Sequence, residues 1–393
     1  MNRVLSVATL YPNSHAPRFG TFVARSLEAL AARGDWEVTL INPIGIPPVP
    51  FGKYRPLSAA AIDAREAGVN VYRPTFPLIP RLGTRFNPAL IARSVIALAK
   101  RLHAERPFDL VDAQFFYPDG PAAARIAGEL NLPLSIKARG SDISYWGQVP
   151  YARRKMLAAA REAAGLLAVS EALADDMAQL GMDRAKITLN RTGLDRDRFR
   201  PLDHTRLRRH LGEELGLPLS GDHPLLATVG ALTARKGQDL VIASLPQLPD
   251  AQLLLVGSGE DRAKLETLAR TLSVSDRVHF LGVVDHDLLP VILSAADAMV
   301  LPSSNEGLAN AWVEALACGT PLVICDAGGA REVVTSAEAG VIVERSLEGI
   351  MGGIRQILAN PPEPEAVAKA ADQFSWAANA ASLAEYYSKI IGA

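Results

Sequence analysis

Residues 301–334 read LPSSNEGLANAWVEALACGTPLVICDAGGAREVV, and this stretch decides the fold. A β-rich run at 298–301 leads into it, a helical segment follows at 309–317, and a second β-rich run follows at 322–325. A strand, a helix and a strand at this spacing predict a right-handed βαβ unit in a parallel sheet. Ligands of such sheets bind beyond the carboxyl ends of the strands, so the loops that follow strands are where chemistry is expected.

The same alternation continues along the rest of the chain. Further β-rich runs lie at 4–10, 36–41, 110–113, 134–137, 225–229, 252–256 and 277–281. Helical segments between them lie at 21–32, 88–104, 121–129, 238–245 and 261–271. Residues 43–56 are rich in Pro and Gly and favour a loop. Two such series predict an α/β protein with two doubly wound Rossmann-like domains that face each other across a cleft.

The charged residues indicate where one domain ends and the other begins. Residues 1–200 contain 27 Lys and Arg against 18 Asp and Glu, a net charge of +9, whereas 201–393 contain 14 against 24, a net charge of −10. We therefore expect an N-terminal domain at 1–200 and a C-terminal domain at 201–375, joined near 195–220. The tail at 376–393 predicts an amphipathic helix whose apolar face carries Trp376, Leu383, Tyr386 and Ile390.

Composition excludes several classes of protein. Hydrophobic residues make up 49% of the chain and charged residues 21%, which is the usage of a globular rather than a disordered protein. Two cysteines, Cys318 and Cys325, are too few for a disulfide framework or a four-cysteine zinc site. No apolar run reaches the ~18 residues of a membrane-spanning helix, and the start lacks the pattern of a signal peptide. We expect a cytoplasmic protein with reduced thiols.

Glu306 and Glu314 are the first candidates for a functional site. Glu306 is expected in the loop after the strand at 298–301, and Glu314 on the helix that follows. The first N–H groups of that helix, at Asn310 and Ala311, would point into the same cleft and could bind an anion. Carboxylates for a sugar and a ribose diol, with N–H groups for phosphate, fit a nucleotide sugar. A capping acid and a surface glutamate are the structural alternative, which we favour for two glutamates taken alone.

Two cations follow the strand at 225–229. That strand ends in Gly230, and Arg235 and Lys236 lead the next helix, where they would neutralise a diphosphate together with the helix dipole. The loop lacks the pattern of a Walker loop. The alternative is an ordinary basic pair at the surface. The Gly-Ser-Gly run at 257–259 lacks the third glycine of a dinucleotide fingerprint, so we interpret it as a turn.

Together these blocks resemble the retaining glycosyltransferases of family four, which have the GT-B fold. The motifs that carry the resemblance are R-K-G at 235–237, E-x7-E at 306–314, A-C-G-T-P at 317–321 and G-G-x-x-E at 328–332. The stretches at 113–133 (AQFFYPDGPAAARIAGELNLP) and 137–143 (KARGSDI) are similar to the bacterial polysaccharide-assembly branch. The resemblance spans nearly the whole chain in outline, is close over 225–345, and is weaker over 165–200.

The resemblance implies an enzyme, a hexosyltransferase, with an acceptor-binding N-terminal domain and a nucleotide-sugar-binding C-terminal domain. The C-terminal helix would cross back onto the N-terminal domain. The donor would be a nucleotide sugar and the acceptor a lipid-linked or polysaccharide hydroxyl, with retention at the anomeric carbon. The resemblance also implies that neither a metal ion nor a cofactor is required.

The resemblance also implies roles for individual residues. Glu306 would contact hydroxyls of the donor sugar and Glu314 the ribose, while Arg235 and Lys236 would stabilise the departing diphosphate. The remaining residues implied at the donor are Gly20, Gly230, Val283, Gly307, Leu308, Asn310 and Ala311. Among these, backbone groups at Asn310 and Ala311 would bind phosphate and those near Val283 the base, and Gly20 would let the N-terminal loop approach the donor.

Two positions depart from the family pattern. Ala231 stands where many relatives carry an arginine, and Arg139 stands where many carry a histidine. An arginine cannot act as a base at neutral pH, so we expect Arg139 to bind a phosphate or to polarise a sugar hydroxyl. We count it among the catalytic residues with Glu306, Arg235 and Lys236. The leaving phosphate would take the proton of the acceptor, and the two-carboxylate scheme of glycoside hydrolases does not apply.

Several other side chains have two interpretations each. His15 is expected to face solvent, and Asp119 to cap the helix that begins near it. The aromatic residues Phe115, Phe116 and Tyr117 would either line an acceptor groove or pack in the core. The histidines show no metal-ligand spacing.

Basic side chains of the first half would face anionic lipid, a lipid-diphosphate acceptor or merely solvent. The residues concerned are Arg81, Arg85, Arg93, Lys100, Arg101, Arg153, Arg154 and Lys155. With the acceptor in view, we expect peripheral contact with an anionic membrane at the inner face of the cell. Nucleic acid is not expected, because no aromatic residues alternate with the basic ones.

Other functions stay open at this point. A sugar-nucleotide epimerase of similar form would need acid and base side chains in the cleft, and we find no convincing set. A catalytically idle nucleotide-sugar-binding subunit that partners another transferase is kept open by Arg139 and Ala231. A nicotinamide dehydrogenase is disfavoured by the missing third glycine at 257–259.

Overall fold

The computed structural model describes residues 1–49, 52–79, 83–219, 223–285 and 287–392. Contacts divide the chain into two compact units. Unit 1 comprises Met1–Gly193 and Trp376–Ala393, and unit 2 comprises Leu194–Ser375. The first crossing therefore lies between Gly193 and Leu194, a few residues before the expected position at 200.

A single large sheet forms the centre of unit 1. Its described strands run in the order β10-β9-β8-β7-β1-β2-β5-β4, all parallel to their neighbours except β4, and β3 pairs with β6 in a separate two-stranded sheet. The central strands are buried on both faces, so most of their residues are apolar, although Asp112 of β7 and Ser135 and Lys137 of β8 are buried as well. The strands are β1 (Asn2–Val7), β2 (Trp36–Ile41), β3 (Ile44–Ile46), β4 (Ala64–Glu66), β5 (Val69–Tyr72), β6 (Thr75–Pro77), β7 (Leu110–Ala113), β8 (Leu134–Lys137), β9 (Gly165–Ala168) and β10 (Ile187–Leu189).

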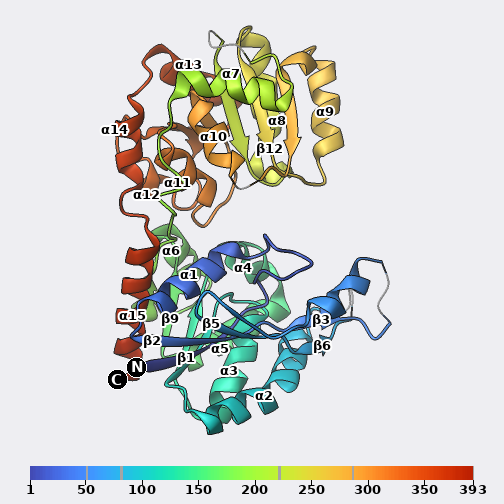
Figure 1. The fold of residues 1–393 in the computed structure, drawn as a ribbon, viewed down its shortest axis with the longest axis vertical. Helices are drawn as coiled ribbons and strands as arrows, with labels where there is room; N and C mark the ends of the chain where they lie inside the picture. The colour runs from blue at the N-terminus through green and yellow to red at the C-terminus, as the bar shows by residue number, and fades with distance from the viewer. Residues whose placement is uncertain (50–51, 80–82, 220–222, 286, 393) are drawn as a thin grey trace. The chain divides into compact units, whose positions relative to one another are not determined.

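Helices cover both faces of this sheet (Figure 1). Successive residues of a strand point to opposite faces, and β8 shows the consequence. Ser135 lies within 3.5 Å of Tyr386 of α15, whereas Ile136 packs against Gly120 of α3. The helices of unit 1 are α1 (Thr21–Ala32), α2 (Asn87–Glu105), α3 (Asp119–Leu130), α4 (Ser141–Ser144), α5 (Pro150–Glu162), α6 (Glu171–Gln179) and α15 (Trp376–Ile391), with 3₁₀ turns η1 (Gly52–Ala60), η2 (Trp146–Gln148) and η3 (Arg184–Lys186).

The C-terminal helix α15 is part of the core of unit 1. It packs beside α1, and Leu383, Tyr386 and Tyr387 are buried in one cluster with the side chains of α1, β1 and β2 (Figure 1). The buried Asn379 accepts a hydrogen bond from Ser26 Oγ at 2.7 Å and donates to Asn190 Oδ1 at 3.0 Å. The expected amphipathic tail helix is thus observed, with a buried polar side chain that the apolar pattern did not indicate.

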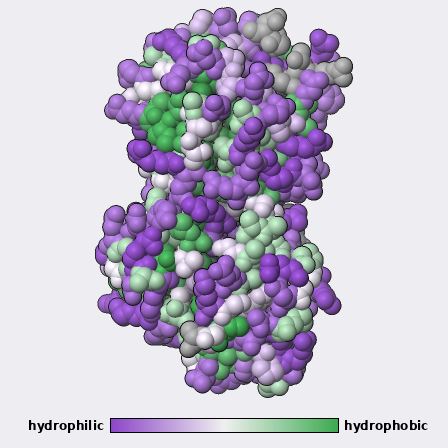
Figure 2. All heavy atoms as spheres, turned by 90° about the vertical axis from the view of Figure 1, so that its left-hand side faces the viewer, coloured by the Kyte–Doolittle hydropathy of each residue, from purple (hydrophilic) through white to green (hydrophobic). Residues whose placement is uncertain are grey.

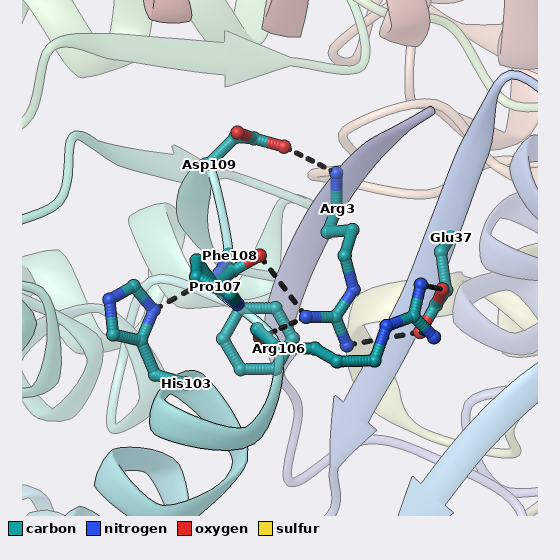
Figure 3. A network of polar contacts seen from close by, with 7 residues as sticks. All are labelled: Arg3, Glu37, His103, Arg106, Pro107, Phe108 and Asp109. Carbon is teal, nitrogen blue, oxygen red and sulfur yellow. Dashed lines mark hydrogen bonds and ion pairs between the residues drawn. The ribbon is translucent and has the colours of Figure 1, made fainter.

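Arg3 ties together the amino-terminal edge of the same sheet (Figure 3). Glu37 of β2 accepts from Arg3 Nη2 at 3.0 Å and from Arg106 Nη2 at 2.8 Å. Asp109 accepts from the backbone N–H of Arg3 at 2.6 Å, and the Arg3 guanidinium lies 4.6 Å from the ring centre of Phe108. This charged network joins β1, β2 and the start of β7 at the edge opposite the carboxyl ends, so its role is structural.

Unit 2 has a smaller parallel sheet. The described strands run in the order β13-β12-β11-β14-β15-β16. They are β11 (Leu225–Val229), β12 (Gln252–Val256), β13 (Val278–Gly282), β14 (Ala298–Leu301), β15 (Leu322–Cys325) and β16 (Gly340–Val343). The helices are α7 (His204–Leu215), α8 (Gln238–Ser244), α9 (Arg262–Thr271), α10 (Leu288–Ala295), α11 (Asn310–Ala317), α12 (Ala330–Val333), α13 (Leu347–Ala359) and α14 (Pro364–Ala368), with 3₁₀ turns η4 (Ala234–Lys236), η5 (Leu245–Gln247), η6 (Ser275–Arg277) and η7 (Lys369–Ala371).

Both faces of this second sheet are also covered. One buried cluster joins the sheet to α8, α9 and α13, and another joins it to α7 and α10. The unit is therefore doubly wound, as the alternation of strands and helices predicts. The fold class expected from the sequence is confirmed for each unit by itself.

Three local expectations need correction. The predicted strand at 4–10 ends at Val7, and residues 43–56 contain β3 and the start of η1 as well as loop. The segment expected to join the domains, 195–220, lies within unit 2 and contains the helix α7. Arg208 on α7 is 3% exposed, pairs with Asp297 at 2.6 Å and donates through Nε to Ala295 O at 2.8 Å. These contacts neutralise part of the charge of this segment inside unit 2.

On the face drawn in Figure 2, hydrophilic side chains predominate and hydrophobic ones form smaller areas among them. Among the described helices, none combines the length and the apolar composition needed to cross a bilayer.

Candidate active site

The strand order of unit 2 reverses between β11 and β14. From β11 the chain moves outward through β12 and β13, then returns to start β14 on the other side. In open α/β sheets the crevice at such a reversal, beyond the carboxyl ends of the strands, is where ligands bind. The two loops that border it are 230–237 and 302–309. These loops carry Arg235, Lys236 and Glu306, so the fold brings together three side chains that the sequence singled out.

Arg235 and Lys236 converge on Glu306. Lys236 Nζ lies 2.5 Å from Glu306 Oε1, and Arg235 Nη1 lies 3.2 Å from the same oxygen. Glu306 is 9% exposed and Lys236 11%, whereas Arg235 is 46% exposed. Burial lowers the pKa of Lys236, and the carboxylate of Glu306 opposes that shift. Two cations thus share one carboxylate, which leaves a net positive charge at the crevice.

Further contacts fix the backbone of these two loops. The backbone N–H of Ser304 donates to Arg235 O at 2.8 Å, and Arg235 Nη1 also donates to the carbonyl of Asn305. Arg345, which follows β16, donates through Nε to Pro302 O at 2.8 Å and through Nη2 to Ala234 O at 3.1 Å. Arg345 therefore holds the turn η4 against the end of β14, and its role was not foreseen from the sequence.

Gly328 packs directly against the backbone of the Glu306 loop. It has a φ of +53°, and a Cβ added there would overlap the carbonyl oxygen of Glu306. The neighbouring Gly329 donates its N–H to Gly307 O at 2.8 Å. The G-G-x-x-E motif therefore acts through its glycines, which let the loop after β15 approach the backbone of Glu306 and Gly307.

The helix α11 begins directly after this loop. Its first residue is Asn310, and Ala309 at the N-cap provides no side-chain hydrogen bond. Leu308 and Ala309 are both 8% exposed and anchor the approach to the helix. The first N–H groups of α11, at Asn310 and Ala311, therefore have no side-chain cap and remain suited to an anion.

Glu314 projects from the second turn of α11. Within the described part of the chain its carboxylate makes no hydrogen bond or ion pair. Burial alone raises its pKa to about 7. A partly buried carboxylate without protein partners suits hydroxyl donors such as those of a ribose. Glu306, in contrast, is not helical, so the two glutamates lie in a loop and on a helix, as expected.

The loops after β12 and β13 complete this edge of unit 2. The backbone N–H of Leu232 donates to Ser258 O at 3.0 Å, so the Gly-Ser-Gly run packs against the loop of Gly230 and serves as a turn, as interpreted from the sequence. Gly230 leaves room beside Lys236, because an added Cβ would lie 3.4 Å from Lys236 Cε. Val283 follows β13 and is 63% exposed, which places it at the same edge but outside the Glu306 cluster.

Unit 1 has its own strand reversal, between β1 and β7. Arg139, after β8, donates through Nε to Gln114 O at 3.2 Å and through Nη2 to Gln114 Oε1 at 2.5 Å, so it lies beside the end of β7. Asp142 holds its backbone in place by accepting from the N–H groups of Arg139 at 3.0 Å and Phe116 at 2.9 Å. Burial lowers the pKa of Arg139 to about 10, which leaves it a cation at neutral pH.

Gly20 closes the loop after β1. It has a φ of +72°, and an added Cβ would lie 2.6 Å from Leu10 O, so only glycine fits between the loop and the start of α1. Packing within unit 1 already requires this glycine, and its expected role toward the donor stays a prediction. His15 in the same loop is exposed, as expected.

Two expectations near α3 are settled by the structure. Asp119 is not a cap, because the N-cap of α3 is Pro118 and has no side-chain hydrogen bond. Its carboxylate instead accepts from Thr9 N at 2.9 Å and Thr9 Oγ1 at 2.7 Å, which ties the end of β1 to α3. The aromatic side chains of this region pack in the core rather than line a groove; Phe115, Phe116 and Tyr117 are exposed by 9%, 0% and 1%.

Among the described residues, no group of three His, Cys, Asp or Glu side chains is placed to hold a metal ion. The histidine at position 286 lies outside the described residues. The polar groups at the strand ends of unit 2 have the chemistry to bind an anionic, hydroxyl-rich ligand.

Sequence comparisons match both units to one family. A family model described as glycosyl transferase 4-like domain matches residues 19–193, and one described as glycosyl transferases group 1 matches residues 216–374. A GDP-mannose-dependent alpha-(1-6)-phosphatidylinositol monomannoside mannosyltransferase of Mycolicibacterium smegmatis is 30% identical over 348 residues, which are 83% of this chain and 85% of that protein. The chain belongs to the family-four glycosyltransferases. The resemblance drawn from the motifs is confirmed.

Other similar proteins support this assignment. A glycogen synthase of Mycobacterium tuberculosis is 34% identical to this glycosyltransferase over 238 residues, 58% of this chain and 54% of that one. The fold matches that of a sucrose-phosphate synthase from Thermosynechococcus elongatus, with a TM-score of 0.79, 21% identity and 100% of both chains covered. A structure of Anabaena HepE in complex with UDP and glucose gives a TM-score of 0.75 at 20% identity, with 99% and 100% of the chains covered. The protein is an enzyme of GT-B fold, from a family that uses nucleotide sugars with retention.

Proposed function

We propose that this glycosyltransferase moves a sugar from a nucleotide-sugar donor to a hydroxyl of a lipid-linked or polysaccharide acceptor, with no metal ion. The observation that carries the proposal is the convergence of Arg235 and Lys236 on Glu306 at the strand reversal of unit 2. The uncapped start of α11 borders the same loop. A nucleotide sugar requires cations, hydroxyl acceptors and free N–H groups in one crevice, and few other ligands do. Cations bind its diphosphate, carboxylates accept from its hydroxyls, and free N–H groups bind its phosphate oxygens.

The leaving group determines what the cations do. When the bond to the sugar breaks, negative charge grows on the nucleoside diphosphate, and fixed cations stabilise it without reorganisation. Lys236 is held in place, and the half-exposed Arg235 has the freedom to turn toward a phosphate. These two side chains would supply the electrostatic role that a metal ion has in other transferases.

The carboxylates would bind rather than transfer protons. Glu306 is fixed by Lys236 and Arg235 and offers its remaining acceptor sites to hydroxyls of the donor sugar. Glu314 has no partner in the described part of the chain and would accept from the ribose. Backbone groups at Gly307, Leu308, Asn310 and Ala311 would complete the donor site on the same loop and helix.

Arg139 suits an acceptor-binding role better than an acid–base role. Its guanidinium stays protonated and is oriented by Gln114, so it can bind a phosphate or polarise a hydroxyl but cannot accept a proton. The proton of the acceptor hydroxyl would pass to the oxygen of the departing phosphate, on the same face of the sugar. No side-chain base is required in this scheme.

The relatives indicate where to look for donor and acceptor. The relative from Mycolicibacterium smegmatis is named for GDP-mannose and for a phosphatidylinositol monomannoside, which supports a lipid-linked acceptor. HepE is described with UDP and glucose. A lipid-linked acceptor would bring this enzyme to the inner face of an anionic membrane as a peripheral protein.

Thermal unfolding tests the donor site. The protein is titrated with GDP-mannose, UDP-glucose, ADP-glucose and a dTDP-sugar in the presence of a chelator. A donor at 100 times its dissociation constant adds about 2.7 kcal/mol to the free energy of unfolding. We expect one nucleotide sugar to stabilise the protein without metal, and Arg235→Ala and Glu306→Gln to abolish that shift.

Matched variants distinguish the site from a general loss of charge. Arg331→Ala and Glu266→Gln change the same residue types at exposed positions of unit 2, where they form surface ion pairs. Both should keep the full shift. Stabilisation by none of the donors would contradict the proposal and favour an idle subunit, and stabilisation only after metal is added would contradict the metal-free part.

A further inference from the structure

Six cations gather around α5 of unit 1, and no ion pair to a carboxylate is found for any of them within the described residues. Their surroundings contain few acids, since neither 67–104 nor 144–161 has an Asp or Glu. Five of these six side chains are exposed, and Lys155 is partly exposed. We name this set the α5 basic face: Arg85, Arg125, Arg153, Arg154, Lys155 and Arg161.

The structure narrows the set of basic residues expected to face lipid. Lys100 pairs with Glu129 at 2.6 Å and Arg101 approaches Glu105 at 3.9 Å, so their charges are partly neutralised. Arg93 is exposed on α2, and Arg81 lies outside the described residues. The cations that remain close to one another are those around α5.

The α5 basic face is continuous across three segments of the chain. Lys155 Nζ donates to the carbonyl of Arg85, which precedes α2. Burial lowers the pKa of Lys155, and repulsion from Arg125 of α3, Arg154 and Arg85 adds to this shift. Like charges held together without carboxylates repel one another, and an external anion would relieve that repulsion.

A groove runs along the exposed side of α5. It has a volume of about 350 Å³, and Arg153, Arg154 and Arg161 line it together with Gln148, Pro150 and Leu157. Arg153 is held in position because its Nη2 donates to Leu180 O at 3.0 Å. Three arginines line this groove, and their charge suits a phosphate headgroup.

Exposed aromatic rings border the same face. Phe86 is 45% exposed, and the guanidinium of Arg85 lies 4.5 Å from its ring centre. Tyr145 is 63% exposed and packs edge-on against Trp146, close in sequence to Gln148 in the groove. Aromatic rings beside cations are typical of surfaces that lie at the headgroup level of a bilayer.

We propose that the α5 basic face is the surface by which this enzyme docks on an anionic lipid bilayer, with a headgroup phosphate in the groove of Arg153, Arg154 and Arg161. The face extends over α5, α3 and the segment before α2, which is wider than one small anion can cover and suits a planar surface. The inference rests on the proposed function only in that a lipid-linked acceptor explains why the enzyme needs a membrane.

Vesicle sedimentation tests this docking surface. The full chain is mixed with vesicles of phosphatidylcholine containing one-third phosphatidylglycerol, and with vesicles of phosphatidylcholine alone. Each basic residue near an anionic surface contributes about fivefold to the partition coefficient. We expect binding only to the anionic vesicles, a decrease as salt rises, and a loss of about 25-fold in Arg154→Gln/Arg161→Gln.

The control removes the same charge from the opposite side of the sheet. Arg25→Gln/Arg33→Gln changes two exposed cations of α1 and its C-terminus, and we expect a loss below about threefold. Equal losses in both variants, or equal binding to both kinds of vesicle, would overturn the proposal. Full displacement by inorganic phosphate at constant ionic strength would also overturn it, because it would indicate a site for a soluble phosphate.

The donor site is measured separately on the same variants. Thermal stabilisation by the nucleotide sugar should be unchanged in Arg154→Gln/Arg161→Gln, which also shows that the variant is folded. Loss of vesicle binding with an intact donor shift supports the docking surface. Absence of vesicle binding in the unaltered enzyme, with donor binding present, would reject the docking surface and leave the proposed function standing.

Discussion

Single residues determine how the Glu306 loop is held. Glu306 is fixed from one side by Lys236 and Arg235 and from the other by the backbone of Gly328 and Gly329. In the proposed function, the carboxylate would therefore already be in position when a sugar binds. Substitutions around this loop should change catalysis more than their distance from the substrate suggests.

Gly328→Ala tests the support beneath Glu306. A left-handed φ costs a residue with a Cβ about 1–2 kcal/mol, and the overlap with Glu306 O adds to that cost. We expect the free energy of unfolding to fall by at least about 2 kcal/mol and kcat to fall at least about tenfold, measured by denaturant unfolding and donor turnover. The control Gly352→Ala lies on α13 with open space around it and should stabilise the protein by about 0.5–1 kcal/mol. Equal effects in both variants would contradict this account.

If Glu314 binds the ribose as proposed, donor binding should depend on pH. Its pKa is raised to about 7 by burial, so the carboxyl group becomes protonated as the pH falls through 7 and accepts hydrogen bonds from hydroxyls less strongly. We expect the KM for the donor to rise about fivefold from pH 8 to pH 6, and Glu314→Gln to have a higher KM that does not change with pH.

The raised pKa of Glu314 also makes the stability of the free enzyme depend on pH, but in the opposite direction: the contribution of Glu314 to stability falls as the pH rises. A carboxyl group whose pKa is raised by folding contributes most when it is protonated, so its contribution declines as the pH rises from about 4 to above 7. Removing the charge in Glu314→Gln should therefore raise Tm at pH 8 and leave it nearly unchanged at pH 4. A variant that is less stable than the parent enzyme at pH 8 would refute the burial effect.

At the level of secondary-structure elements, the turn η4 is positioned by a residue that follows the edge strand β16. Arg345 follows β16 and bonds to both Pro302 and Ala234, so it joins three loops that are distant in sequence. Arg345→Gln should keep the fold but loosen η4, with kcat falling about tenfold and the KM for the donor changing less than threefold. Steady-state kinetics check this expectation, and the exposed Arg355→Gln on α13 is the control.

Helices and strands with strong patterns were predicted from sequence. The helix α1 has the predicted bounds, and β11, β12 and β14 are apolar runs because both of their faces are buried. The short strands β3 and β4 could not be predicted, since three residues carry no periodic signal and their pairing depends on other segments.

The candidate site was predictable only where a motif carries it. Arg235, Lys236 and Glu306 stand in recognisable motifs after strands, whereas Arg345 and Gln114 act through contacts that join distant segments and leave no local pattern. Asp119 shows the limit of local reasoning. A carboxylate at a helix start suits a cap, but Thr9 in the loop after β1 offers two donors instead.

At the scale of the whole molecule, unit 1 depends on the last helix of the chain. Asn379 of α15 bonds with Ser26, Asn190 and Arg191, and a Cβ added at Gly193 would overlap Trp376, so the two crossings between the units lie side by side in unit 1. The helix is thus locked by polar bonds as well as by apolar packing.

Asn379→Ala tests this lock. The substitution leaves the buried Ser26 hydroxyl without its acceptor, and such a group costs about 1–3 kcal/mol, whereas Asn190 keeps its bonds to Lys137 and to the backbone carbonyl of residue 379. We expect the unfolding transition of unit 1 to shift down while donor stabilisation of unit 2 is retained, as measured by calorimetry with and without donor. The control Ser388→Ala removes an exposed hydroxyl of the same helix and should shift the transition by less than about 0.5 kcal/mol. A uniform shift of both transitions would argue against a role confined to unit 1.

The discontinuity of unit 1 has a consequence for synthesis on the ribosome. Residues 1–193 emerge first, but the cluster of Trp36, Leu30 and Val38 stays uncovered until α15 has been translated. Unit 2 is continuous and is complete before that helix exists, so the usual order of folding, in which the first domain made is the first to fold, is reversed in its final step. The apolar face of the nascent N-terminal half therefore stays accessible to chaperones until the 18 residues 376–393 have been synthesised.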